Sequence, residues 1–303
     1  MYNFVVSPKN WRARDAADKE MVREAFNTWK ATGMGLNIAE SQDPFARTHI
    51  VIAFARSAGT WSKIGSEAIG AGARTMNFAV SLQTPQGRLL ALHEVGHALG
   101  FKHEHLNPTN GVVWKDVSAV RAHFAATEGW TDLVTDEEVI TKLPADQFGN
   151  RPWDPDSIMN YRIPAALMKN RSKDVDPTGL SKGDIARALR FYPRVRSADV
   201  QRMTPFESQI LPQRSGEQGF YEFTPKEDRK YQIRTFGESD ISMSLYERGD
   251  DGVERYIATD DDSGLDTNAQ IEVRLFARRR YIVRLRVLHT SAPGQASVMV
   301  VAI

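Results

Sequence analysis

The spacing of apolar residues divides the chain into two parts of different character. Up to about residue 193, segments with helical spacing alternate with short apolar runs, whereas beyond residue 219 short strands follow one another with turn residues between them. Periods of about 3.6 and 2 residues mark amphipathic helices and half-buried strands. The pattern predicts an α+β domain over residues 1–195 and an all-β sandwich over residues 196–303, with residues 196–218 as linker or first strand.

The first part has clear helix signals. Thr84 and Pro85 have the character of an N-cap and first helical residue, and Ser181 is a second N-cap. Predicted helices cover residues 15–32, 117–126, 136–143 and 181–191, together with the segment that starts at Thr84. Predicted strands cover residues 1–6, 36–39, 50–54 and 75–80, and the glycine-rich residues 70–74 are predicted to be a loop.

The second part is predicted to hold seven or eight short strands. Examples are residues 220–223, 231–235, 241–246, 271–276, 281–287 and 297–303.

The amino-acid composition argues against several classes of function. The chain has 303 residues, a net charge of +1 and no cysteine. A nearly neutral chain gives no electrostatic reason to expect binding to nucleic acid or to an anionic membrane. No apolar run reaches membrane-spanning length. The lack of cysteine excludes a disulfide framework, a cysteine-ligated zinc and a cysteine-based zymogen switch, but it does not fix the compartment.

The N-terminal residues do not have the pattern of a signal peptide, because the apolar stretch is too short and lacks a basic start. The fold is expected to begin almost at once. We therefore expect either a mature fragment with an added methionine or a protein exported without a cleaved signal.

The segment HEVGHALGFKHEH, residues 93–105, carries the strongest chemical signal. On a helix, His93 and His97 share one face and can direct two imidazoles at one metal ion. Glu94 lies near the edge of that face, where it can take a proton from water. Gly100 can end the helix and turn the chain back, so that His103 arrives from another direction. Three histidines with an open fourth position are typical of a catalytic zinc site.

The alternative is an ordinary core helix with satisfied histidines, since Leu89, Leu92, Gly96 and Leu99 form an apolar stripe. That alternative does not explain three histidines and a glycine in register.

With Met159 downstream, in residues 156–161 (DSIMNY), the zinc segment resembles the metzincin metalloproteases. The resemblance implies a twisted mixed sheet with an active-site helix and a Met-turn, in which Met159 lies beneath the metal. Tyr161, two residues after Met159, is similar to the tyrosine of astacins and serralysins. The resemblance implies that it ligates zinc at rest and swings away to stabilise the transition state; the alternative is a core aromatic residue.

Glu104, directly after His103, resembles the astacins, whereas serralysins usually have proline there. The absence of cysteine and the sequence Leu106, Asn107 and Pro108 depart from animal astacins. The resemblance is therefore closer to bacterial astacin-like secreted metalloproteases, which implies an extracellular protein.

In metzincins, the strand before the active-site helix is an edge that pairs with the bound substrate. The predicted strand with Thr75, Met76, Asn77 and Phe78 occupies the corresponding place, so these residues are expected to bind substrate. An ordinary sheet strand is the alternative.

The second part resembles the bacterial pre-peptidase C-terminal domain, on residues 221–223, 239–240, 245–246, 260–264 and 281–287. Calcium-binding glycine-rich nonapeptides are absent, which argues against a serralysin C-terminus. Asp260, Asp261 and Asp262 are candidate calcium ligands. A solvated turn is the favoured alternative.

Together these features predict a zinc-dependent metalloendopeptidase with one Zn²⁺, Glu94 as general base and Tyr161 as oxyanion donor. It is expected to be a monomer that acts on protein or peptide substrates, with no nucleic-acid partner and no membrane span. Two alternatives stay open: an inactive protease fold used for binding or adhesion, and a toxin-like protease with a single host target.

Overall fold

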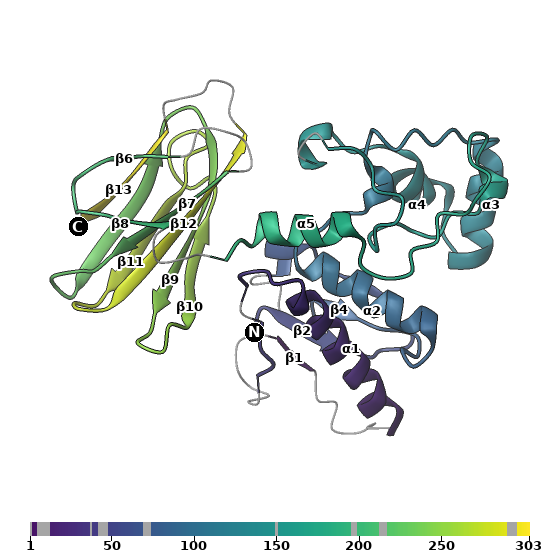
Figure 1. The fold of residues 1–303 in the computed structure, drawn as a ribbon, viewed down its shortest axis with the longest axis horizontal. Helices are drawn as coiled ribbons and strands as arrows, with labels where there is room; N and C mark the ends of the chain where they lie inside the picture. Colours follow the sequence, from purple (N-terminus) through teal and green to yellow (C-terminus); the bar gives the residue numbers. More distant parts are fainter. Residues whose placement is uncertain are drawn as a thin grey trace. The chain divides into compact units, whose positions relative to one another are not determined.

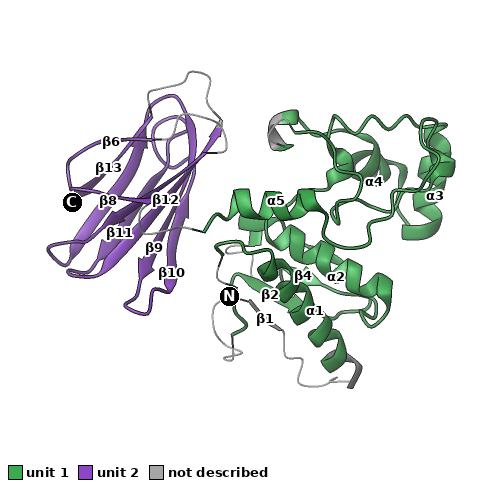
Figure 2. Ribbon diagram, in the orientation of Figure 1, with its two compact units in different colours: residues 1–194 green, residues 195–303 purple. Residues whose placement is uncertain are grey.

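The computed structural model describes residues 2–4, 13–36, 38–41, 48–68, 74–148, 151–194, 199–211, 217–289 and 296–303. The chain divides into two compact units, Met1–Arg194 and Val195–Ile303 (Figure 2). The division lies one residue before the boundary expected after residue 195. Each unit has a hydrophobic core of its own.

A mixed four-stranded sheet forms the first layer of the N-terminal unit. Its strands are β1 (Tyr2–Phe4), β2 (Ile50–Ala53), β3 (Trp61–Ser62) and β4 (Met76–Asn77), in the order β1-β2-β4-β3. The pairs β1–β2 and β2–β4 are parallel, and β3 runs antiparallel to β4. Two predicted strands, residues 1–6 and 50–54, are confirmed as β1 and β2. The predicted strand 36–39 is wrong, because its described residues form none.

Two long helices, α1 (Ala13–Ala31) and α2 (Pro85–Ala98), run side by side and pack against this sheet (Figure 1). Both were predicted. Val22, Phe26 and Trp29 recur every three or four residues, so α1 buries one face, and the Trp29 indole Nε1 donates to the Leu92 carbonyl of α2 at 3.0 Å. This packing fixes α2, which carries the first two histidines, against the core.

The rest of the unit is built from short helices. They are α3 (Val117–Glu128), α4 (Asp132–Thr135), a π-helical turn (Asp136–Ile140), α5 (Lys182–Phe191) and 3₁₀ turns at Gly65–Ala68, Glu104–Leu106, Ala145–Phe148 and Ala165–Leu167. The predictions at 117–126 and 181–191 are confirmed. The predicted helix over residues 136–143 is confirmed only up to Ile140, as a π-helical turn, and the Leu143 N–H donates instead to the Leu106 carbonyl at 3.0 Å.

The strand that was expected to pair with substrate lies inside the sheet. β4 lies between β2 and β3, so its backbone is hydrogen-bonded to a neighbouring strand on both sides. The Thr75 N–H donates to Val51 at 3.0 Å, and the Thr75 carbonyl accepts from Lys63 at 2.8 Å. The prediction that Thr75, Met76, Asn77 and Phe78 form a substrate-binding edge is therefore wrong. Among the described residues, the outer strand on this side is β3.

The C-terminal unit is a two-sheet β structure, as predicted. One sheet has the order β10-β9-β12-β7-β5 and the other β11-β8-β13-β6. The first sheet contains β5 (Val200–Arg202), β7 (Gln218–Phe223), β9 (Asp240–Arg248), β10 (Glu254–Asp260) and β12 (Arg280–His289). The second contains β6 (Gln209–Ile210), β8 (Arg229–Phe236), β11 (Gln270–Leu275) and β13 (Ser297–Ala302). Because residues 196–218 contribute β5 and β6, this segment is more than a linker.

Alternation along the strands builds the core between the two sheets. Tyr281, Val283 and Leu285 of β12 are buried and share their core with Ile233 of β8 and Val300 of β13. Successive side chains of a strand point to opposite faces, so every second residue reaches this core.

The acidic turn after β10 has the geometry of a solvated turn. Asp260 accepts hydrogen bonds from the backbone N–H groups of Ser263 (3.0 Å) and Gln270 (2.7 Å), while Asp261 and Asp262 are exposed. Within the described residues, the one cluster able to hold a metal ion lies elsewhere. Calcium at these aspartates is not supported.

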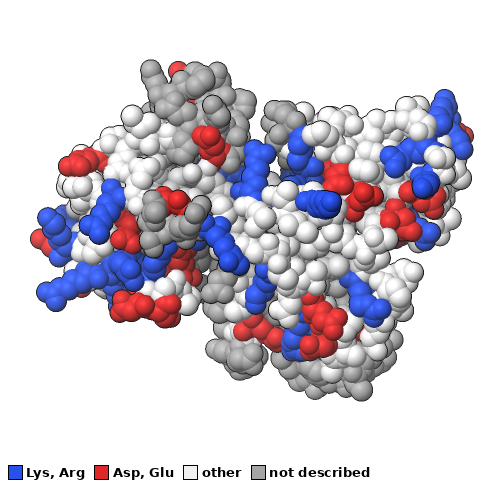
Figure 3. Space-filling model, viewed as in Figure 1, with Lys and Arg blue, Asp and Glu red and all other residues white. Residues whose placement is uncertain are grey.

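Charged side chains of both signs are interspersed on the face of each unit seen in Figure 3. Among the described residues, no helix has the length and apolar character needed to cross a membrane.

We expect residues 1–194 to fold without the second unit, because the two cores share no residue. All six tryptophans, at positions 11, 29, 61, 114, 130 and 153, lie in the first unit, so their fluorescence reports on it alone. A chain ending at Arg194 should unfold in urea at the same midpoint as the full-length protein. A clearly lower midpoint would show that the units stabilise each other.

Candidate active site

Helix α2 begins and ends where the sequence predicts. The Thr84 hydroxyl accepts the Gly87 N–H at 3.0 Å, and Pro85 occupies the first turn, where its missing N–H costs nothing. At the other end Gly100 has a φ of +87°, a conformation that suits glycine.

The turn at Gly100 is a Schellman motif. The Phe101 N–H donates to Gly96 at 3.0 Å and the Gly100 N–H to His97 at 2.7 Å, which satisfies two carbonyls at the helix end. The reversal returns the chain toward α2 and delivers His103 opposite the two helical histidines.

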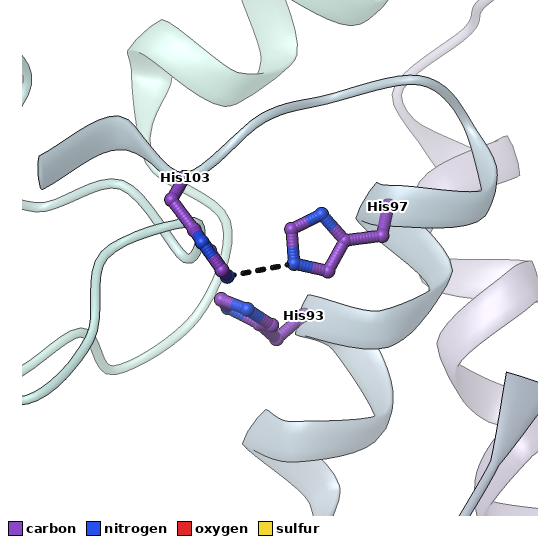
Figure 4. A group of neighbouring side chains, drawn as sticks. All are labelled: His93, His97 and His103. Carbon is purple, nitrogen blue, oxygen red and sulfur yellow. Dashed lines mark hydrogen bonds between the residues drawn. The ribbon is translucent and has the colours of Figure 1, made fainter. Parts of the chain in front are cut away.

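The three predicted ligands converge. His93 and His97 extend from α2 and His103 from the following loop, with their rings facing one another (Figure 4). One ligand nitrogen of each lies within 4.8 Å of the other two, and the Nε2 atoms of His97 and His103 are 2.9 Å apart.

The opposite nitrogens of these rings identify the tautomers. Nδ1 of His93 lies 2.8 Å from the Ile158 carbonyl, and Nδ1 of His97 lies 2.7 Å from the Phe101 carbonyl. A carbonyl oxygen only accepts, so each Nδ1 carries the proton and each Nε2 presents a lone pair. Lone pairs of two rings that converge in this way can bind one cation. The donor set therefore fits a metal ion.

Burial keeps these imidazoles neutral. Loss of solvation lowers the pKa of His93, lowers that of His97 to about 3, and lowers that of His103 well below its ordinary value. Neighbouring histidines contribute to the lowered pKa values of His97 and His103. Neutral imidazole is the form that binds a metal.

The fourth histidine of the segment is not a ligand, although it stacks on His103 with ring centroids 5.1 Å apart. His105 is fully buried, and its Nδ1 accepts from the Tyr161 N–H at 3.2 Å. Its Nε2 lies 2.7 Å from the Glu138 carbonyl and must donate. Both nitrogens of His105 are therefore hydrogen-bonded. His105 carries its proton on Nε2, whereas His93 and His97 carry theirs on Nδ1.

Glu94 follows His93 on α2 and is buried. It is 5% exposed, and its Oε2 makes no hydrogen bond within the described part of the protein. Burial raises the pKa of this carboxyl to about 8. A carboxyl with a raised pKa is suited to accept and return a proton near neutral pH.

Met159 packs against α2 and Tyr161 against the histidines, while the roles expected of both stay predictions. Met159 is fully buried against Gly96 of α2, where the Cβ of any larger residue would overlap the methionine sulfur. The Tyr161 ring lies against His103, with centroids 4.3 Å apart. Burial raises the Tyr161 pKa well above its ordinary value, so the phenol stays protonated and can donate a hydrogen bond.

Next to the site is a buried ionic cluster that the sequence analysis did not predict. Glu104 is fully buried and accepts from Arg151 Nη1 at 2.7 Å and from Arg187 Nη1 at 2.5 Å. Arg187 also donates to Asp184 and, at 2.7 Å, to the Ser157 hydroxyl. The two carboxylates and two guanidinium groups balance in charge, which is required of ions removed from water.

This cluster joins two segments: the loop that carries His103 (residues 100–106, the ligand loop) and the Met-turn (residues 156–161). Glu104 follows His103 directly, and its N–H donates to the Met159 carbonyl at 2.9 Å. Asp184 accepts the Ile158 N–H at 2.8 Å, and Ile158 is the residue whose carbonyl holds His93. Ser181 was predicted as an N-cap, and the structure adds its capping box with Asp184. The further hydrogen bond of Asp184 to the Met-turn depends on tertiary structure.

Comparison with known proteins agrees with this geometry. The family model described as astacin, a peptidase family, matches residues 10–185. The chain belongs to the astacin family. Members of this family are zinc-dependent metallopeptidases, so the metal that the triad fits is zinc.

Among solved structures, myroilysin has a similar fold. A structure of myroilysin is 24% identical, with a TM-score of 0.54, and covers 65% of this chain and 93% of its own. A second myroilysin structure is 25% identical, with a TM-score of 0.43, over 64% and 83% of the two chains. The pre-peptidase C-terminal domain of a Bacillus anthracis collagenase is 13% identical, with a TM-score of 0.27, over 35% and 98%. The fold of the second unit is established by its own two sheets.

We expect Arg187→Met to destabilise the astacin unit by about 3–5 kcal/mol, because it leaves Glu104 and Asp184 buried with too little compensating charge. Urea unfolding of the metal-free protein, followed by tryptophan fluorescence, measures the loss. Arg190→Met, at an exposed position of the same helix, is the matched control. Equal stability of the two variants would contradict a structural role for the cluster.

Proposed function

We propose that this astacin-family chain is a zinc metalloendopeptidase in which His93, His97 and His103 hold the metal. The observation that carries the proposal is the convergence of three histidine nitrogens within 4.8 Å of one another, with Nε2 of His97 and of His103 at 2.9 Å and two Nδ1 protons bound to carbonyls. This arrangement presents lone pairs to a single point.

Glu94 is proposed as the general base. Zinc, when bound, supplies Lewis acidity that activates water and polarises a carbonyl. The Glu94 carboxylate takes the proton of the attacking water and returns it to the leaving amine. Its burial supports this role, because desolvation raises its pKa to about 8 and so makes the carboxylate a stronger base.

Tyr161 is proposed as a hydrogen-bond donor to the oxyanion of the tetrahedral intermediate. Its ring lies beside His103, and its phenol stays protonated. A neutral donor directed at developing negative charge stabilises the transition state more than the ground state.

The outer strand β3 is proposed to receive the peptide substrate. β3 pairs on one side with β4 and is the last strand in the described sheet order. A peptide can add as a further strand there, with backbone hydrogen bonds supplying affinity. The family also supports an extracellular location, and we propose the C-terminal unit as an accessory domain for large substrates.

The purified protein should contain about one zinc per chain, and a chelator should abolish peptide hydrolysis until zinc is restored. Glu94→Gln keeps the side-chain size but removes the base, so the rate should fall at least ~100-fold with zinc content unchanged. Glu24→Gln, at an exposed position of α1, is the control.

Zinc analysis and kinetics on one peptide decide this prediction. Activity of Glu94→Gln within a few-fold of wild type would exclude Glu94 as the base. A zinc-loaded wild-type protein without hydrolytic activity would favour the inactive binding protein.

Tyr161→Phe removes the hydroxyl and keeps the packing of the ring. We expect kcat to fall roughly 10–1,000-fold with a smaller change in KM, because the contact forms mainly in the transition state. Tyr246→Phe, in the other unit, controls for nonspecific effects. If kcat is unchanged, Tyr161 is only a packing residue.

A further inference from the structure

The third ligand is held differently from the other two. His103 lies on a loop, and its Nδ1 faces a carboxylate oxygen of Glu138 at 3.4 Å. The other two ligands direct their Nδ1 atoms at backbone carbonyls. The His103 side chain is 13% exposed and that of Glu138 is 43% exposed, so the contact lies at the rim of the site.

The backbone around Glu138 is fixed against the ligand loop. The π turn closes with the Thr141 N–H on the Asp136 carbonyl at 2.8 Å, and the Glu138 carbonyl accepts from His105 Nε2 at 2.7 Å. The Lys142 ammonium donates to the His105 carbonyl at 2.9 Å. Glu138 therefore holds His105 with its backbone and faces His103 with its side chain. Such π turns are frequent at functional sites.

A carboxylate on the distal nitrogen of a ligating histidine has a defined effect. It accepts the Nδ1 proton, fixes the ring orientation and makes Nε2 a stronger donor to the metal. We propose that Glu138 is a positioning residue that orients His103 and strengthens zinc binding. This inference rests on the proposed function, because it requires that the triad hold zinc.

The structure separates this role from a purely structural one. The contact to His105 uses the Glu138 carbonyl, which every substitution preserves. Removing the carboxylate therefore leaves the loop anchored and changes only the partner of His103. Glu137, the exposed neighbour in the same turn, provides a control of equal charge.

Zinc dissociation constants, measured by competition with a chromogenic chelator, test the proposal. Glu138→Ala should weaken zinc binding about 10–100-fold, the usual effect of losing such a partner. Glu138→Gln should lose less, because its amide oxygen still accepts the Nδ1 proton. Glu137→Gln should match wild type, and the metal-free melting temperature of Glu138→Ala should be unchanged.

Zinc affinity of Glu138→Ala within about two-fold of wild type would overturn the inference while leaving the proposed function standing. A weaker affinity that accompanies a lower metal-free melting temperature and is not recovered in Glu138→Gln would also overturn it, because the role would be structural. A wild-type protein that binds no zinc would refute the proposed function itself, and the inference with it.

Discussion

Two imidazoles of the astacin triad donate their Nδ1 protons to backbone carbonyls, His93 to Ile158 and His97 to Phe101. These two hydrogen bonds decide which nitrogen of each ring carries a lone pair, and therefore whether the site can bind a metal at all. Much of the surrounding structure places these two acceptors. The Schellman turn at Gly100 brings the Phe101 carbonyl back to α2, and the Met-turn brings the Ile158 carbonyl from a segment more than sixty residues away.

The need to position these two acceptors explains why charged residues are buried next to the site. Asp184 binds the Ile158 N–H, and Arg187 links Asp184 to Glu104, which follows the third ligand in sequence. A buried ion pair contributes little net stability compared with apolar packing, but loss of one partner is costly. The cluster therefore fixes the register between the ligand loop and the Met-turn more than it adds stability.

The parts of the site that could be predicted from the sequence are those set by local chemistry. Thr84, Pro85 and Gly100 bound the helix through caps that depend on neighbouring residues, and histidine spacing placed two ligands on one face. The alternation of apolar residues was enough to predict the sandwich. The three histidines that converge were predicted from motif spacing, whereas the roles of Met159 and Tyr161 were implied by the family resemblance and stay predictions.

The parts that could not be predicted depend on contacts distant in sequence. β3 has only two residues, too few for a periodic signal, yet its pairing makes β4 an interior strand. The π turn forms because Glu138 and Leu143 bond to the ligand loop instead of to their own helix. Arg187 lies on a helix with an ordinary charged pattern, and nothing local distinguishes it from the exposed Arg190.

The central claim is that three histidine Nε2 atoms, and not His105 or Met159, hold the zinc. X-ray absorption spectroscopy at the zinc edge of the purified full-length protein tests it most directly. We predict three imidazole nitrogens at about 2.0–2.1 Å with oxygen completing the shell and no sulfur. Four imidazoles, or a sulfur near 2.3 Å, would contradict the tautomers and the geometry on which the account rests.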